Sequence, residues 1–158
     1  MPKEIERKFV LATEAKLGDL GLGSKIFQGY LLAQDGKEVR LRQNCRTSPS
    51  HPHGRFFLTS KEGSGLVRQE HEVEVSELIF QTLWPQTEGS RLIKWRYPAV
   101  DDPELVVDVY EGELAGLVVL EREFPSVDEA EIYNLPAWAK EAKEVTGDKR
   151  YSNAKLAS

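Results

Sequence analysis

Apolar and charged residues alternate along one segment of this sequence after another, and this alternation constrains the fold more than any other feature. Near the N-terminus, Glu4, Glu6 and Lys8 alternate with Ile5 and Phe9. Successive side chains of a β-strand point to opposite faces of a sheet, so such a strand has one apolar face and one charged face. The pattern predicts strands at residues 4–10, 26–33, 38–43, 55–61, 67–75, 91–97, 104–111 and 117–124.

Helical segments are fewer and shorter than the predicted strands. Ser76 is a typical N-cap for a helix that Pro85 would end. Ser126 and Glu129 have the spacing of a capping box, which predicts a second helix after Ser126. A third helix is predicted over residues 136–145, with a glycine after its end.

Two arrangements fit strands with one apolar and one charged face. In an open sheet the charged faces would lie in water, which is the common arrangement. In a closed barrel they would point inward, and no sheet edge would be exposed. Three short helices wrap the outside of a barrel more readily than they fill its inside, and Arg and Glu dominate the polar faces. We therefore expect residues 1–158 to form a single α+β domain, an eight-stranded antiparallel closed β-barrel with helices packed outside.

Inward-pointing charged faces would bring acids and bases into one enclosed space. Burying so many charges is costly unless they pair with one another or bind a ligand. Carboxylates hold hard divalent cations, and guanidinium groups bind phosphate oxygens through two parallel hydrogen bonds. The charge inventory therefore predicts a metal and polyphosphate site. The acids are Glu4, Glu6, Glu70, Glu72, Asp108, Glu121 and Glu123, and the bases are Lys8, Arg40, Arg42, Lys61, Lys94 and Arg96.

Overall charge and cysteine content narrow the class of protein. The net charge of −5 gives no basic field to hold nucleic acid, so we expect no nucleic-acid partner. The single cysteine excludes an internal disulfide framework and fits a reducing compartment. No stretch approaches the roughly 20 apolar residues of a membrane helix, and the charged N-terminus does not resemble a signal peptide. We expect a cytoplasmic monomer or homodimer with no membrane partner.

A series of short motifs resembles the CYTH superfamily, the triphosphate tunnel metalloenzymes. The resemblance begins with the Glu-x-Glu-x-Lys pattern of residues 4–8, and the later motifs follow in the order typical of the family. Gln28-Gly29-Tyr30-Leu31 and residues 83–89 resemble the short bacterial enzymes that hydrolyse inorganic triphosphate. The other matching segments are residues 39–42, 59–61, 68–72, 94–96, 108, 121–123 and 149–153.

The resemblance implies a tunnel that holds a linear triphosphate and a divalent cation, Mg²⁺ or Mn²⁺. Its metal ligands would be Glu4, Glu6, Asp108, Glu121 and Glu123. Its phosphate-binding residues would be Arg40, Arg42, Lys61, Lys94, Arg96 and Lys149. Lys8 and Tyr30 match a lysine and a tyrosine proposed to act together on the attacking water. Glu70 and Glu72 match acids that orient the basic residues or complete a second metal site.

The chemistry of phosphoryl transfer agrees with these roles, because it needs positioning and charge stabilisation more than covalent help. A lysine surrounded by cations has a lowered pKa and can act as a base, which is the expectation for Lys8. Tyr30 would lie on the charged face of its strand, either as the partner of Lys8 or as an aromatic residue of the barrel wall.

Several functions remain open for such a tunnel. They are an inorganic triphosphatase, a class IV-type adenylyl cyclase, a thiamine or nucleoside triphosphatase, and a noncatalytic polyphosphate- or nucleotide-binding module. No base-recognition motif is evident, and the presence of Lys8 and Tyr30 with both charge sets argues against a mere binder. We predict metal-dependent hydrolysis of inorganic triphosphate to pyrophosphate and phosphate.

Overall fold

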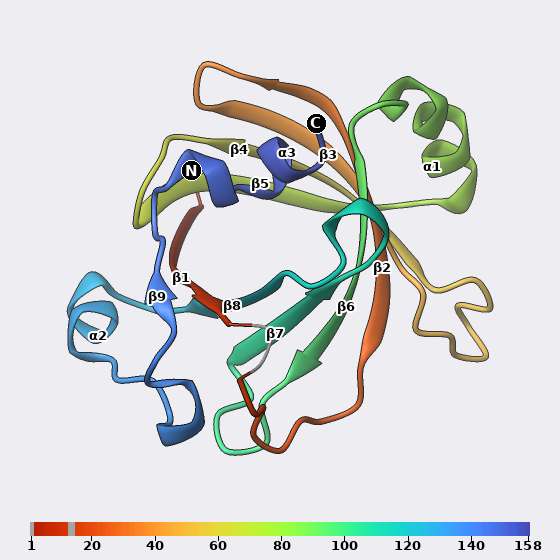
Figure 1. Ribbon diagram of the computed structural model, residues 1–158. Coiled ribbons are helices and arrows are strands. Elements are labelled where there is room, and N and C mark those ends of the chain that lie inside the picture. The colour runs from red at the N-terminus through yellow and green to blue at the C-terminus, as the bar shows by residue number, and fades with distance from the viewer. Residues whose placement is uncertain (1, 13–14) are drawn as a thin grey trace.

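The strands form a closed antiparallel barrel in the computed structural model, which describes residues 2–12 and 15–158 (Figure 1). The order around the barrel is β5-β4-β3-β2-β6-β7-β8-β1, and pairing between β1 and β5 closes the ring. The predicted α+β barrel is confirmed, and each predicted strand coincides with an observed one. These are β1 (Lys3–Leu11), β2 (Ser24–Gln34), β3 (Lys37–Asn44), β4 (Arg55–Glu62), β5 (Val67–Val75), β6 (Arg91–Pro98), β7 (Leu105–Tyr110) and β8 (Val118–Glu123).

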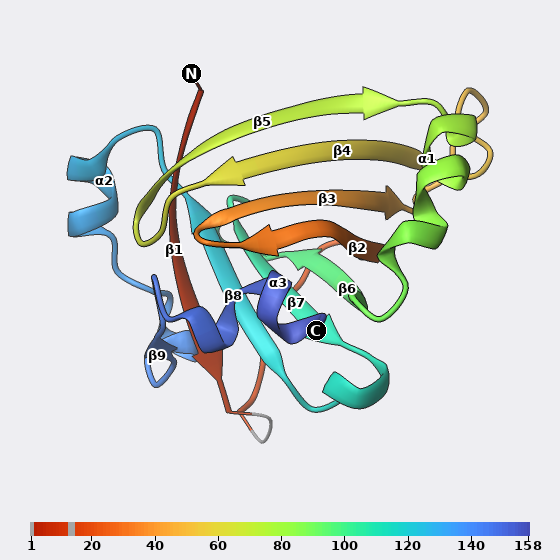
Figure 2. The same cartoon turned by 90° about the horizontal axis from the view of Figure 1, so that it is seen from above.

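Two curved layers of strands face each other across the barrel, and the strands of one layer cross those of the other (Figure 2). One layer contains β2 to β5, and the other contains β1, β6, β7 and β8. β1 joins the two layers, because Lys3–Ile5 pairs with β5 whereas Glu6–Leu11 pairs with β8. The inward-facing side chains of both layers therefore meet in the barrel interior.

Short helices and loops surround the strands. Here η denotes a 3₁₀-helix. The segments are α1 (Glu77–Leu83), η1 (Trp84–Thr87), η2 (Gly112–Leu114), α2 (Val127–Ile132), η3 (Ala137–Ala139), η4 (Lys149–Tyr151) and α3 (Asn153–Leu156). Among residues 2–12 and 15–158, no helix is long and apolar enough to cross a bilayer.

Most strands have an apolar outward face, and α1 and η3 cover parts of these faces. On the layer of β2 to β5, Leu41 and Phe56 pack against Phe80 of α1. On the opposite layer, Val107 and Leu120 form a second buried cluster that includes residues of η3. Burying these apolar faces outside the barrel leaves the charged faces of the same strands inside it.

The barrel interior changes character along its length. At one end it is charged, whereas at the other it is apolar and contains Leu92, Tyr110 and Val119. Ala157, directly after α3, completes this apolar cluster, and Asn153 of α3 accepts a hydrogen bond from the Tyr110 hydroxyl. The C-terminal segment therefore fills one end of the barrel, and the charged cavity lies on its inner side.

Two of the three predicted helices are confirmed. The Ser76 and Ser126 hydroxyls cap α1 and α2 by accepting hydrogen bonds from the backbone N–H groups of Ile79 and Glu129. Pro85 does end the α-helix, but the chain continues to turn as η1.

The prediction of a third helix over residues 136–145 is wrong. Only η3 turns there, and Lys143–Glu144 forms a short ninth strand, β9, which pairs with Phe9 and Val10 of β1. This edge of β1 is free because β5 pairs only with its first residues. The Arg7 guanidinium holds β9 in place by donating to both carboxylate oxygens of Glu144, at 2.9 and 2.8 Å. Tertiary pairing has overridden local helical preference.

Candidate active site

A cavity of about 290 Å³ lies inside the barrel and is lined mainly by charged side chains. Among the predicted site residues, only Asp108 and Lys149 are absent from its lining. The predicted residues that line it are Glu4, Glu6, Lys8, Tyr30, Arg40, Arg42, Lys61, Glu70, Glu72, Lys94, Arg96, Glu121 and Glu123. The alternation of the strands therefore brings residues from distant parts of the sequence into one enclosed space.

The cavity lining also contains four residues that were not predicted as site residues, namely Glu38, Arg68, Ser152 and Asn153. Glu38 and Arg68 form an ion pair at 2.8 Å, and each shares the inward face of its strand with predicted residues. The strand alternation could therefore have identified both. Ser152 and Asn153 enter from the C-terminal segment, whose position no strand pattern indicates.

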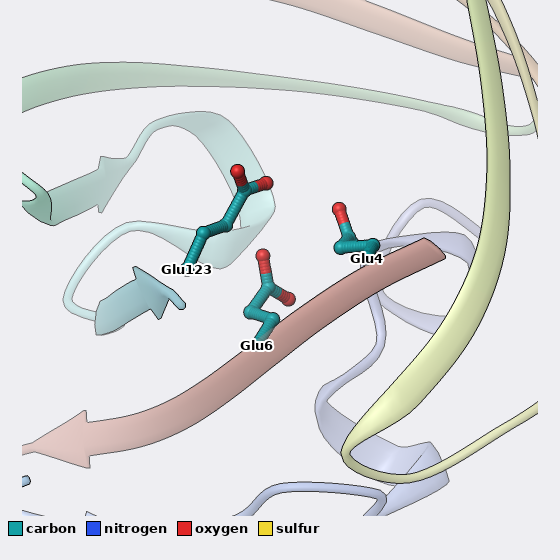
Figure 3. A group of neighbouring side chains, drawn as sticks. All are labelled: Glu4, Glu6 and Glu123. Carbon is teal, nitrogen blue, oxygen red and sulfur yellow. The ribbon is translucent and has the colours of Figure 1, made fainter. Parts of the chain in front are cut away.

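Three carboxylates converge at one part of the cavity wall, those of Glu4 and Glu6 from β1 and that of Glu123 from β8 (Figure 3). One carboxylate oxygen of each lies within 4.8 Å of the others. Burial and the nearby charge of Glu121 raise the pKa of Glu6 to about 8, and burial also raises the pKa values of Glu4 and Glu123. A divalent cation would offset this repulsion, and oxygen ligands alone suit Mg²⁺ or Mn²⁺. The donor set fits the expected ion.

Lys61 of β4 connects this acidic group with the basic side chains. Its ammonium donates to both carboxylate oxygens of Glu4, at 3.0 and 2.9 Å, and lies 3.3 Å from the carboxylate of Glu70. Any cation at the three carboxylates would therefore share Glu4 with Lys61. Glu70, for its part, contacts a basic residue, as expected for an orienting acid.

The guanidinium groups of Arg40 and Arg42 form a cationic part of the wall. They share one carboxylate, that of Glu72, at 4.0 and 3.4 Å, and Thr59 also donates to it at 2.6 Å. Burial, together with the charges of Arg40 and Arg96, lowers the pKa of Arg42 to about 10. Within the described part of the chain, the buried Nε atoms of Arg40 and Arg42 have no hydrogen-bond partner. This part of the cavity is suited to an anion.

A chain of buried and partly buried ion pairs runs across β6, β7, β8 and β1. The Asp108 carboxylate, which is 0% exposed, accepts from Lys94 Nζ and from two nitrogens of Arg96, each at 2.8 Å. The Arg96 guanidinium also donates to the Glu121 carboxylate at 3.0 Å, and this carboxylate lies 3.4 Å from the ammonium of Lys8. Asp108 therefore holds two basic side chains from behind the wall, and its role as a metal ligand stays a prediction.

The expected lowering of the pKa of Lys8 is wrong. Burial acts to lower it, but the carboxylates of Glu121 and Glu6 outweigh burial, so the pKa of Lys8 is raised. The lysine with a lowered pKa is Lys94, whose value burial and the Arg96 charge bring to about 8 despite the attraction of Asp108. Sequence alternation placed both lysines inside the barrel, but it did not identify the charges that surround each one.

Tyr30 lies on the charged face of β2 as predicted, and it is almost fully buried at the junction between the cavity and the apolar end of the barrel. Burial raises the pKa of its hydroxyl. Lys149, by contrast, is exposed on η4, where its carbonyl accepts from the Ser152 hydroxyl at 3.0 Å. The structure does not bring Lys149 into the cavity wall, and Ser152 of the same motif lies there instead.

A closed antiparallel barrel with opposed carboxylates and basic side chains inside it has the architecture of the triphosphate tunnel proteins. The fold is similar to that of the inorganic triphosphatase NE1496 in its crystal structure, with a TM-score of 0.62 and 38% sequence identity over 99% of this chain and 95% of that one. An inorganic triphosphatase of Nitrosomonas europaea is 42% identical over 157 residues, which is 98% of this chain and 96% of that protein. One from Acetivibrio thermocellus is 34% identical over 162 residues, covering 99% and 94%.

No protein-family model matches the chain. The identity to full-length relatives and the shared barrel nevertheless show its family. The chain belongs to the inorganic triphosphatases of the triphosphate tunnel fold.

Proposed function

We propose that the protein hydrolyses inorganic triphosphate to pyrophosphate and phosphate inside the barrel, with Mg²⁺ or Mn²⁺ as cofactor. The observation that carries this proposal is the division of one small cavity into a carboxylate group around Glu6 and a cationic group around Arg42. A metal-bound polyphosphate is a ligand that complements both groups at once. Relatives that cover nearly the whole chain carry the name inorganic triphosphatase.

The basic side chains would bind the substrate along its length. Arg40 and Arg42 offer guanidinium groups with unpaired Nε atoms, and Arg96 is held rigidly by Asp108. Such preorganised donors absorb the charge that develops on the departing pyrophosphate, without reorganisation during the reaction. A cation at Glu4, Glu6 and Glu123 would supply further charge neutralisation on the phosphate oxygens.

Lys8 and Tyr30 are the proposed pair that acts on the attacking water. The raised pKa of Lys8 means that its ammonium is charged when the neighbouring carboxylates are ionised, and an anionic substrate would favour the charged form further. Lys8 would therefore orient water or a phosphate oxygen as a cation, and it would not accept a proton. Tyr30, whose raised pKa keeps its hydroxyl protonated, would donate a hydrogen bond from the other side.

The lining of the cavity favours a substrate without a nucleobase. Charged and polar groups make up the lining apart from the ring of Tyr30 among the described residues, so a base would find no apolar platform there. The adenylyl cyclase and the nucleoside or thiamine triphosphatase alternatives each require a place for a ring system. Inorganic triphosphate requires none.

The test is hydrolysis of tripolyphosphate, ATP and thiamine triphosphate in parallel, each with Mg²⁺, with Mn²⁺ and with EDTA, with all products identified. We expect phosphate and pyrophosphate from tripolyphosphate, no activity in EDTA, and loss of activity by orders of magnitude in Glu6→Gln at limiting Mg²⁺. Glu62→Gln, at an exposed glutamate, is the matched control. Cyclic AMP from ATP, or full tripolyphosphatase activity in EDTA, would refute the proposal.

A further inference from the structure

Gln28 of β2 is completely buried on the same face of the strand as Tyr30, and it is outside the lining of the cavity. Its cross-strand neighbours are Arg42 on β3 and Leu92 on β6. Its amide Nε2 donates a hydrogen bond to the Tyr30 hydroxyl oxygen at 2.8 Å. Within the described residues, its Oε1 atom has no hydrogen-bond partner. The observed contact of its polar group is therefore with Tyr30.

Stability does not explain a glutamine at this position. A buried polar group without a partner costs about 1–3 kcal/mol, whereas methionine has a similar volume and no amide to satisfy. The apolar cluster that includes Tyr30 and Leu92 lies alongside, so an apolar side chain at position 28 would have suitable neighbours. The hydrogen bond to the Tyr30 hydroxyl is the observed contact through which the amide can contribute.

The hydrogen bond controls the direction of the Tyr30 proton. A tyrosine hydroxyl donates one proton and accepts through its oxygen. Gln28 fills an acceptor position of that oxygen, and Arg40, the cross-strand neighbour of Tyr30, is a guanidinium that can only donate. Neither neighbour can accept the proton in this arrangement. The acceptors left for it lie on the side of the cavity, where the Glu38 carboxylate or a bound ligand could accept.

We propose that Gln28 is a positioning residue that holds the Tyr30 hydroxyl so that its proton faces the triphosphate or the attacking water. This inference rests on the proposed function and adds to it a residue that does not touch the substrate. Because the amide acts only through Tyr30, its effect on catalysis must disappear when the hydroxyl is removed.

A double-mutant cycle on tripolyphosphate tests this dependence. Gln28→Met should lower kcat about five- to twentyfold with little change in KM, as expected for the loss of one orienting hydrogen bond. Gln28→Glu should lower kcat further, because a carboxylate accepts the Tyr30 proton and turns it away from the cavity. In the Tyr30→Phe background, Gln28→Met should have no further effect. Gln34→Met, at an exposed glutamine of the same strand, is the control and should keep full activity.

A second measurement is independent of turnover. Gln28 favours the ionised form of Tyr30 by donating to its oxygen, so Gln28→Met should raise the Tyr30 pKa in a carbon-13 NMR titration of labelled tyrosine. An unchanged Tyr30 pKa would overturn the inference even if the protein does not hydrolyse tripolyphosphate. An active wild type in which Gln28→Met lowers kcat equally with and without the Tyr30 hydroxyl would overturn it while leaving the proposed function intact. Full kcat in Tyr30→Phe would overturn it as well.

Discussion

Replacing Asp108 with asparagine tests whether this carboxylate is a counter-ion within the wall or a ligand of the metal. Asp108→Asn keeps the shape of the side chain and removes its charge. The ammonium of Lys94, which is 1% exposed, then loses its 2.8 Å partner, and Arg96 keeps only its 3.0 Å contact with Glu121 at full charge. A buried ammonium and a partly buried guanidinium would then face a deficit of negative charge in the metal-free protein.

The size of the effect follows from the burial of this group. Removing one partner of a buried ion pair typically costs about 3–5 kcal/mol. For a domain of this length, each kcal/mol corresponds to about 2–4 °C in Tm, so Asp108→Asn should melt about 6–20 °C below the wild type. The control is Glu74→Gln, which neutralises a carboxylate whose partner Arg55 is exposed, where about 0–1 kcal/mol is expected.

The deficit should also depend on pH. Burial lowers the pKa of Lys94 to about 8. Between pH 8 and the ordinary pKa of lysine, the unfolded chain therefore binds a proton that the folded protein has released, so the free energy of unfolding rises with pH. Asp108 favours the charged form of Lys94, and its removal moves this rise to lower pH. The Asp108→Asn deficit should therefore shrink as the pH approaches 8.

Thermal melts in EDTA across this pH range would check these expectations. If Asp108→Asn has the same Tm as the wild type in EDTA but loses the stabilisation that Mg²⁺ gives, Asp108 is a metal ligand and the counter-ion assignment is wrong.

Two further expectations concern the carboxylates and the lysine they surround. Without divalent cations, the thermal stability of the wild type should fall as the pH rises from 4.5 to about 8, because folded Glu6 keeps a proton that unfolded Glu6 has released. In thermal melts, Glu6→Gln should flatten this profile and saturating Mg²⁺ should reverse it. A flat wild-type profile would contradict the raised pKa of Glu6. If Lys8 acts as a cation, Lys8→Arg should retain at least about tenfold more kcat than Lys8→Met on tripolyphosphate, and equal losses in steady-state kinetics would instead favour proton transfer by the amine.

The barrel could be predicted from the sequence because strand alternation is a local property with a global consequence. Once the face with Ile5 and Leu41 was assigned to the outside, the positions of Glu4, Glu6 and Arg40 followed without any knowledge of which strands pair. The same rule could have identified Glu38 and Arg68. The prediction of a helix over residues 136–145 was wrong because Lys143–Glu144 pairs with the free edge of β1 as a strand. The sequence does not reveal that this edge is free.

Charge partners inside the barrel are a different kind of information, and alternation does not contain it. Lys8 and Lys94 are both inward-facing lysines, on β1 and β6 of the same layer, yet the pKa of Lys8 is raised and that of Lys94 is lowered. The difference arises from register: Lys8 lies opposite Glu121 in the β1–β8 ladder, whereas Lys94 shares the carboxylate of Asp108 with Arg96. A shift of the β1–β8 ladder by two residues would keep every charged side chain inside the barrel, but it would place a different residue opposite Lys8. The fold therefore depends on which face is charged, whereas the chemistry of each side chain depends on the exact pairing of the strands.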